Sequence, residues 1–223
     1  MNKTIGVLGG MGPESTTKFY ELLIEKYFKK KKDYAYPEIV VFSVDFAKII
    51  KLQEEGNKKK YIAELMKGIN ALQKAGADFA VIASNTPHMV FEELSKLSKI
   101  PLLSIVKNTL DRAKKMKFRK LLLIGTKFTM QANFYHETFK PSGIEIVVPN
   151  LKEQKIINDI IYKNLFKSAS KKKMIEIIKR YKVDGVILGC TELPLILTAK
   201  DLKVRLLDTL DIHAEATLEF ALR

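Results

Sequence analysis

Residues 185 to 193 read Gly185-Val186-Ile187-Leu188-Gly189-Cys190-Thr191-Glu192-Leu193. The apolar run contains β-branched residues and stops at a glycine, a cysteine and two polar residues. This pattern predicts a buried strand whose carboxyl end opens into a loop. Ligands of open α/β sheets bind just beyond such strand ends. Cys190 is the only cysteine of the chain, and it is either a small buried apolar residue, as most free cysteines are, or a residue of a functional site.

An earlier stretch has the same design. Residues 78 to 88 read Asp-Phe-Ala-Val-Ile-Ala-Ser-Asn-Thr-Pro-His, an acidic residue followed by an apolar run and small polar side chains, with Ser84 in the place of Cys190. The strands that open the two halves, Ile5–Gly10 and Leu121–Thr126, also resemble each other. Repetition on this scale predicts a duplicated βα unit. We therefore expect two similar lobes that face each other across a cleft.

Apolar strands alternate with amphipathic helices along the chain, which predicts an α/β fold with parallel sheets covered by helices. The pattern divides into a first lobe at residues 1–105 plus 209–223 and a second lobe at residues 106–208. In the second lobe it predicts a loop over residues 125–130 and helices over residues 131–139 and 152–166.

The composition is that of an ordinary globular protein, with 223 residues of which 47% are hydrophobic. No apolar run approaches the roughly 18 residues that a membrane helix needs, so no membrane partner is expected. The opening Met1-Asn2-Lys3-Thr4 lacks the apolar core of a signal peptide. Together with the single cysteine, this leads us to expect a cytoplasmic location.

The net charge of +14 raises the question of a polyanionic partner. The lysines form short clusters at residues 29–32, 58–60 and 171–173, without interleaved aromatic residues. That distribution favours a solvated surface and no nucleic-acid partner. Gly-Gly-Met-Gly-Pro at residues 9–13 predicts a strand-to-helix turn with free N–H groups, which suits an anion, but it lacks the spacing of a dinucleotide fingerprint.

Several motifs, taken together and in order, carry a resemblance to one family. They are Gly-Val-Leu-Gly-Gly-Met at residues 6–11, Asn-Thr-x-His at 85–88, Gly-Thr-x-x-Thr at 125–129, Gly-Cys-Thr-Glu at 189–192, and Asp-Thr-x-x-Ile-His-Ala-Glu at 208–215. The chain resembles the aspartate/glutamate racemases, the cofactor-independent amino-acid racemases, over nearly its whole length. The resemblance implies two α/β lobes with the active site between them.

The implied reaction removes the α-proton of an amino acid on one face and returns a proton on the other, without pyridoxal phosphate. Two thiols normally do this, because a thiol titrates near pH 8.5 and an electropositive site lowers its pKa further. Here the second thiol is present as Cys190, but Ser84 stands at the first position. A hydroxyl is a poor base at neutral pH unless another group takes its proton. Ser84 is similar to the threonine of one branch of the family, which acts on acidic amino acids and prefers one enantiomer.

Other roles follow by resemblance. Five neutral donors could hold the substrate carboxylate and the developing enediolate. Each is equally well explained as a helix cap or a turn residue. They are Asn85, Thr86, Thr126, Thr129 and Thr191. The backbone N–H groups of Met11 and Gly12 could assist. Gln53 resembles the same branch, and Glu192 is either a substrate contact or a first-turn helix residue. His88 and His213 could tune the catalytic groups, with a helix-start contact as the alternative for His88. A distal substrate carboxylate would need a cation, for which there are four candidates: Lys51, Lys127, Lys163 and Lys167.

The leading hypothesis is a racemase of aspartate or glutamate, with Cys190 as thiolate base and acid and Ser84 on the opposite face. The resemblance implies a homodimer and no cofactor, and the sequence has no His/Cys cluster spaced to bind a metal. One alternative is a single-thiol decarboxylase or isomerase that acts on a small dicarboxylate. The other is a catalytically weak homologue that only binds a ligand, which the retained Cys190 argues against.

Overall fold

The computed structural model describes residues 2–223. The chain forms two compact units: lobe 1 comprises Met1–Asn108 and Leu210–Arg223, and lobe 2 comprises Thr109–Thr209. The chain passes from lobe 1 to lobe 2 inside the helix α5 (Ile105–Lys115). It returns to lobe 1 at the start of the helix α10 (Thr209–Ala221). The sequence pattern predicts the first lobe boundary between residues 105 and 106. In the structure, α5 begins in lobe 1 and continues into lobe 2.

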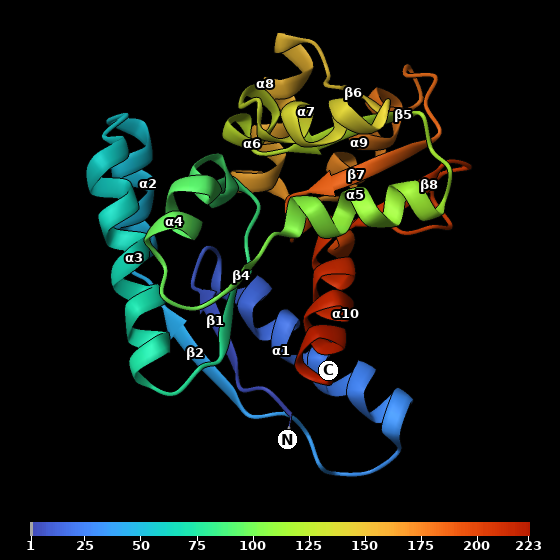
Figure 1. Cartoon of the computed structure of the whole chain (residues 1–223). Helices are drawn as coiled ribbons and strands as arrows, with labels where there is room; N and C mark the ends of the chain where they lie inside the picture. Colours follow the sequence, from blue (N-terminus) through green and yellow to red (C-terminus); the bar gives the residue numbers. More distant parts are fainter. Residues whose placement is uncertain (1) are drawn as a thin grey trace. The chain divides into compact units, whose positions relative to one another are not determined.

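Lobe 1 is built on a four-stranded parallel sheet with the order β2-β1-β3-β4 (Figure 1). Its strands are β1 (Ile5–Gly9), β2 (Ile39–Ser43), β3 (Phe79–Ile82) and β4 (Leu102–Leu103). The two central strands, β1 and β3, are buried along their whole length, as expected for a parallel sheet with both faces covered.

Helices cover both faces of this sheet. Leu8 and Ile82 pack against one layer, formed by α2 (Phe46–Glu54), α3 (Lys58–Lys74) and α4 (Phe91–Leu97). Ile5 and Val7 pack against the other layer, formed by α1 (Pro13–Lys31) and α10. Figure 1 shows α2 and α3 on one side of β1 and β2, and α1 and α10 on the other. Neighbouring residues of β1 thus face opposite layers, which follows from the alternation of side chains along a strand.

Lobe 2 repeats the sheet with the order β6-β5-β7-β8, again parallel. Its strands are β5 (Lys120–Gly125), β6 (Glu145–Val147), β7 (Gly185–Gly189) and β8 (Arg205–Asp208). Three segments pack on one face, namely α8 (Leu151–Asp159), the π-helix η3 (Ile160–Asn164) and α9 (Ser168–Ile178). The short helices of this lobe are α6 (Lys127–Gln131), α7 (Phe134–Phe139), η2 (Lys140–Ser142) and η4 (Leu193–Leu195). Two parallel sheets flanked by helices confirm the predicted fold class.

The same device holds the amino-terminal end of each sheet. Asp78 accepts the backbone N–H of Thr4 at 2.7 Å, just before β3 and β1 begin. Asp184 accepts the N–H groups of Arg119 and Lys120 at 2.7 and 2.9 Å, just before β7 and β5 begin. These backbone donors hold the pKa of the Asp184 carboxyl below its usual range. Each carboxylate therefore clamps the starts of two central strands together.

Two helical predictions in lobe 2 differ from the structure. The segment 125–130 is not a loop throughout, because Thr126 caps α6 by accepting the N–H of Thr129. The predicted helix over residues 152–166 consists of α8 followed by the π-helix η3. A π-helix widens the turn by one residue, which a five-residue stretch of sequence periodicity does not reveal.

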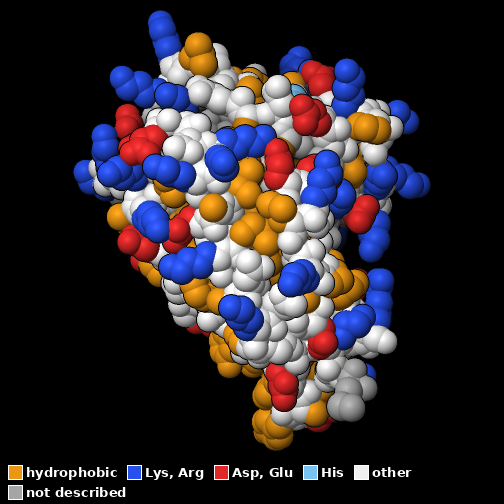
Figure 2. All heavy atoms as spheres, turned by 60° about the vertical axis from the view of Figure 1, so that its left-hand side comes forward, with side chains coloured by type: hydrophobic (Ala, Val, Ile, Leu, Met, Phe, Trp, Pro, Cys, Tyr) orange, Lys and Arg blue, Asp and Glu red, His pale blue; other side chains and the backbone are white. Residues whose placement is uncertain are grey.

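On the face drawn in Figure 2, Lys and Arg side chains are scattered among Asp and Glu side chains and do not gather in one patch. Several lysines of lobe 1 are paired across elements, among them Lys48 with Glu64 and Lys58 with Glu93, each at 2.5 Å. This agrees with the interpretation of the lysines as a solvated surface. Within residues 2–223, no helix has the length and apolar character needed to cross a bilayer.

Candidate functional site

Ser84 and Cys190 occupy equivalent positions in the two sheets. In lobe 1, Leu8 of β1 pairs with Ile82 of β3, and Ser84 follows two residues later. In lobe 2, Ile124 of β5 pairs with Leu188 of β7, and Cys190 again follows two residues later. Each residue therefore sits just beyond the carboxyl end of a central parallel strand, where α/β sheets bind their ligands.

Glycines allow a close approach at the strand end that leads to Cys190. A Cβ atom on Gly125 would lie 2.9 Å from the carbonyl oxygen of Gly189, and one on Gly189 would lie 3.0 Å from that of Ile124. Side chains at these positions would push β5 and β7 apart. The direction in which the chain leaves β7 toward Cys190 therefore depends on glycine at both positions.

Cys190 is half-buried against the core of lobe 2, and its surroundings favour the protonated thiol. Burial raises the pKa of Cys190 to about 12, and the Glu192 carboxylate adds to the effect, while the backbone N–H groups of Glu192 and Leu193 oppose it. The two-thiol chemistry of the family calls for an electropositive site that lowers the thiol pKa, whereas the pKa of Cys190 in the free protein is shifted upward. The cause is desolvation of a sulfur next to an acidic residue, with no cationic side chain among the groups that act on it.

Ser84 is buried in lobe 1, and the imidazole of His88 contacts its backbone. The nearest imidazole, His88, places Nδ1 3.0 Å from the backbone carbonyl oxygen of Ser84. Burial lowers the pKa of His88 to about 4. His213 is also fully buried, with its Nδ1 2.8 Å from the Asn108 amide nitrogen and its pKa well below the usual value because of burial and the nearby His88. The two histidines that are predicted to tune the catalytic groups are therefore neutral rings. His88 contacts backbone groups and His213 contacts the Asn108 amide.

The remaining lobe 1 candidates lie in three segments. Asn85 is buried and Thr86 half-buried, directly after Ser84. The Met11 side chain packs in the core, which leaves its backbone as the candidate contact, and Gly12 is the half-buried N-cap of α1. Gln53 on α2 donates from Nε2 to the hydroxyl of Tyr61 on α3 at 2.8 Å. The sequence pattern does not predict this bond, which joins α2 to α3.

The lobe 2 candidates cluster around two strand ends. Thr126 and Thr129 are buried, and their hydroxyl oxygens lie 3.1 Å apart at the end of β5. Thr191 is buried and Glu192 is half-buried, both after β7. Since Gly125 and Gly189 pair in the sheet, these two groups of polar residues leave neighbouring strands at the same level.

The four candidate cations are all exposed. Lys51 lies 3.9 Å from Glu55, the C-cap residue of α2, and Lys163 lies 3.4 Å from Asp159. Lys163 belongs to the π-helix η3, and Lys167 is the N-cap residue of α9. Lys127 opens α6, where its backbone N–H donates to Asn158 at 2.8 Å. Over the described residues 2–223, no three His, Cys, Asp or Glu side chains are grouped as metal ligands.

A sequence model of the Asp/Glu/Hydantoin racemases matches residues 8–217, nearly the whole chain. The chain belongs to the Asp/Glu/Hydantoin racemase family. This membership confirms the resemblance stated from the motifs and makes the class of reaction racemisation, an isomerase reaction.

Relatives of this racemase-family chain extend over its full length. The broad specificity amino-acid racemase RacX of Bacillus subtilis (strain 168) is 27% identical over 224 residues, 96% of each chain. The structure of an aspartate racemase homologue from Pyrococcus horikoshii OT3 is 36% identical, covers 99% of this chain and 100% of its own, and has a TM-score of 0.87. The aspartate racemase of Picrophilus torridus is 27% identical, with coverage of 98% and 94% and a TM-score of 0.79.

Proposed function

We propose that this chain is a racemase of an acidic amino acid, with aspartate as the first candidate and glutamate as the second. The observation that carries the proposal is the equivalent register of Ser84 and Cys190 in a member of a racemase family. Cys190 abstracts the α-proton on one face of the substrate and returns it in the reverse direction. Ser84 delivers a proton on the opposite face.

The substrate itself supplies a positive charge next to Cys190. A thiol with a pKa of about 12 is almost fully protonated at neutral pH and is a poor base in the free protein. The α-ammonium group of a bound amino acid is a positive charge close to the reacting carbon, and an opposite charge within about 4–6 Å favours the thiolate. When the neutral donors described below hold the substrate carboxylates, the α-ammonium group favours loss of the Cys190 proton to solvent, and the thiolate base then forms only in the occupied site.

Neutral donors stabilise the negative charge that develops when the α-proton leaves. Thr126, Thr129 and Thr191 in lobe 2, and Asn85 and Thr86 in lobe 1, are hydroxyl and amide groups at strand ends. Preorganised donors aimed at developing charge are usually the largest single contribution to catalysis. The aspartate racemase among the relatives supports the choice of aspartate.

Hydrogen exchange in deuterated water tests the proposal. Each enantiomer of aspartate and glutamate is incubated with the protein, and α-deuterium is followed by NMR while chirality is followed by chromatography. We expect exchange into one enantiomer to exceed inversion, because Cys190 is a better acid–base group than Ser84. The variant Cys190→Ala should lose more than about 100-fold of this exchange, in line with the loss of a general base, and should keep its melting temperature.

A Cys190→Ala protein that retains exchange would overturn Cys190 as the base. An unmodified protein that exchanges no amino acid would favour the single-thiol decarboxylase or isomerase, since such an enzyme needs only one proton donor. The second candidate function, a single-thiol decarboxylase or isomerase, is supported by Ser84, which stands in the place of the first thiol. Turnover of malonate and maleate analogues, measured on the same preparation, separates the two.

A further inference from the structure

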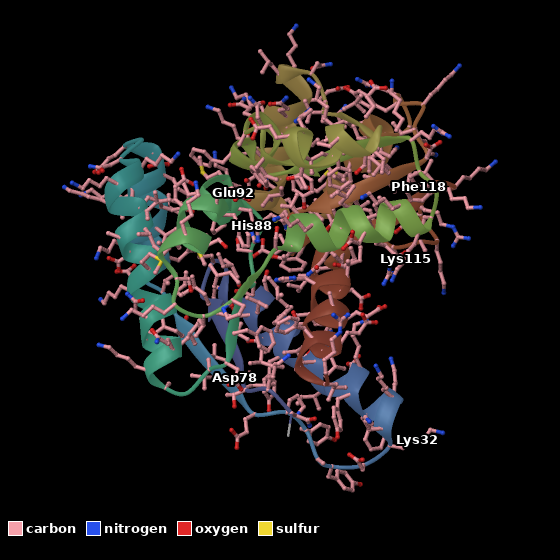
Figure 3. All side chains as sticks on the ribbon, viewed as in Figure 1. Lys32, Asp78, His88, Glu92, Lys115 and Phe118 are labelled. Atoms are coloured by element: carbon pink, nitrogen blue, oxygen red, sulfur yellow. The ribbon has the colours of Figure 1, made fainter. Side chains whose placement is uncertain are left out.

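His88 bridges two segments of lobe 1 through its imidazole ring. It belongs to the 3₁₀-helix η1 (Thr86–Val90) and is only 3% exposed. Its Nε2 accepts the backbone N–H of Ile105 at 3.1 Å, and its Nδ1 lies 3.0 Å from the carbonyl oxygen of Ser84. In Figure 3, His88 lies between α4 and the start of α5, the helix that Ile105 opens.

The partners of the ring decide where its proton sits. A backbone N–H only donates, so Nε2 must offer its lone pair to Ile105. The proton of a neutral ring is then on Nδ1, from which it donates to the carbonyl oxygen of Ser84. A protonated ring would carry N–H groups on both nitrogens and would lose the bond to Ile105. The buried position and its lowered pKa keep the ring neutral.

Packing prevents the ring from turning. His88 is stacked on Phe91, with ring centroids 5.1 Å apart and planes 6° from parallel. The ring of His213 stands edge-on to it at 6.5 Å and 84°. The backbone N–H of His88 also donates to the carbonyl oxygen of Asn85 at 3.0 Å. One residue therefore holds two successive carbonyl groups, those of Ser84 and Asn85.

We propose that His88 is a positioning residue, which sets the direction of the Ser84 side chain and the Asn85 amide by holding both backbone carbonyls in place. The inference rests on the proposed function of Ser84 as the proton donor of one face. A weak acid such as a hydroxyl depends on alignment, and a displacement of about 1 Å can cost about 100-fold in rate. Lobe 2 lacks this device: Pro194 stands four residues after Cys190, and the Cys190 carbonyl accepts the Leu193 N–H instead.

Two amide variants separate the two bonds of the ring. The side-chain nitrogen of asparagine reaches about as far as Nδ1, so His88→Asn keeps a donor for the Ser84 carbonyl and loses the acceptor for Ile105. The side-chain oxygen of glutamine reaches about as far as Nε2, so His88→Gln keeps the acceptor and loses the donor. Both variants remove the stacked ring, and each serves as the other's control for lost stability.

The first readout is the ratio of inversion to α-proton exchange in deuterated water. Exchange depends on Cys190 and inversion depends also on Ser84, and both are measured in one sample, so the folded fraction cancels. We expect the ratio to fall about tenfold or more in His88→Gln and to stay within about threefold of the unmodified protein in His88→Asn. Equal ratios in the three proteins would overturn the proposal.

The second readout needs no turnover, so it decides the proposal even if the proposed function fails. Nitrogen NMR of the unmodified protein should place the His88 proton on Nδ1 and find no titration from pH 8 to about pH 5. The backbone amide signal of Asn85, which shares a peptide bond with the Ser84 carbonyl, should shift in His88→Gln and much less in His88→Asn. A proton on Nε2, a titration near pH 6.5, or an unshifted Asn85 signal in His88→Gln would contradict a positioning role.

Discussion

Ser84 and Cys190 have the same place in two similar sheets but very different proton chemistry. The thiol can become a base when a positive charge arrives, whereas the hydroxyl has no titrating imidazole beside it. The structural equivalence and the chemical asymmetry together predict that the two faces of the substrate are served at unequal rates. Replacing the hydroxyl tests this directly.

The variant Ser84→Cys should gain rate for the disfavoured enantiomer by about tenfold or more, which corresponds to about 1.4 kcal/mol off the barrier. A thiol is nearly isosteric with a hydroxyl, so the buried position should accept it. Rates of α-proton exchange for both enantiomers provide the measurement. Ser95→Cys, on the exposed side of α4, controls for a second thiol in lobe 1. An unchanged ratio of the two rates would mean that another group serves the Ser84 face.

For single residues, the sequence predicts the two strand-end positions, Ser84 and Cys190, well. An apolar run that stops at a small polar side chain is a local pattern. The sequence does not predict the direction in which the Cys190 pKa moves, since that depends on desolvation by residues distant in the chain. Nor does it predict the His88–Ile105 bond, because the two residues are 17 positions apart and the pattern at either one is unremarkable. The assignment of roles to all these residues stays a prediction.

Among the elements, the contact between the ends of β5 and β7 bears most directly on the site. The two strands approach through Gly125 and Gly189, and Cys190 follows immediately. The segment after β7 can keep its course only while that contact is kept.

The variant Gly125→Ala should lose stability by about 1–3 kcal/mol, because its Cβ would meet the Gly189 backbone. It should also lose activity per folded molecule. Gly185→Ala is the matched control at the opposite end of β7, where a Cβ would meet the Phe118 ring at 3.0 Å and the Arg205 carbonyl oxygen at 3.1 Å. Urea unfolding gives the stability and active-site exchange gives the activity. If Gly125→Ala were destabilised but as active per folded molecule as Gly185→Ala, the link from this contact to Cys190 would be wrong.

The elements themselves follow from sequence where a long apolar period repeats, as in α3 and in the central strands. The predictions differ from the structure where a segment is short. Helix α6 has five residues and lies largely within a predicted loop, and η3 replaces the end of a predicted helix with wider turns. In such segments, a capping side chain or one added residue per turn determines which type of helix forms. The segment is too short for its hydrophobic period to predict this.

For the whole molecule, the two buried histidines of lobe 1 couple stability to pH. His88 and His213 have pKa values lowered by burial, and Nε2 of His213 has no hydrogen-bond partner among the described residues. Both rings are neutral in the folded state at pH values where the unfolded chain is protonated. The unfolded state then binds more protons, so stability is fully present above about pH 6.5 and falls as the pH drops.

His88 should remove about 2 kcal/mol of unfolding free energy between pH 7 and pH 5, at about 1.36 kcal/mol per pH unit below 6.5, and His213 should add a loss in the same direction. Urea unfolding across this range measures the loss. His88→Asn should reduce the slope, because one of the two titrating groups is gone. A free energy of unfolding that stays constant from pH 7 to pH 5 would mean that the rings are already protonated or are solvated in the folded protein.

The aspartates at the starts of the central strands, Asp78 and Asp184, have a consequence for how this chain can evolve. Each clamps the end of its sheet opposite to the end from which Ser84 and Cys190 emerge. A substitution at either reactive position therefore leaves the clamp of its own sheet untouched. One sheet can therefore carry a hydroxyl and the other a thiol at the same register position, while both keep an aspartate at the far end of the strand.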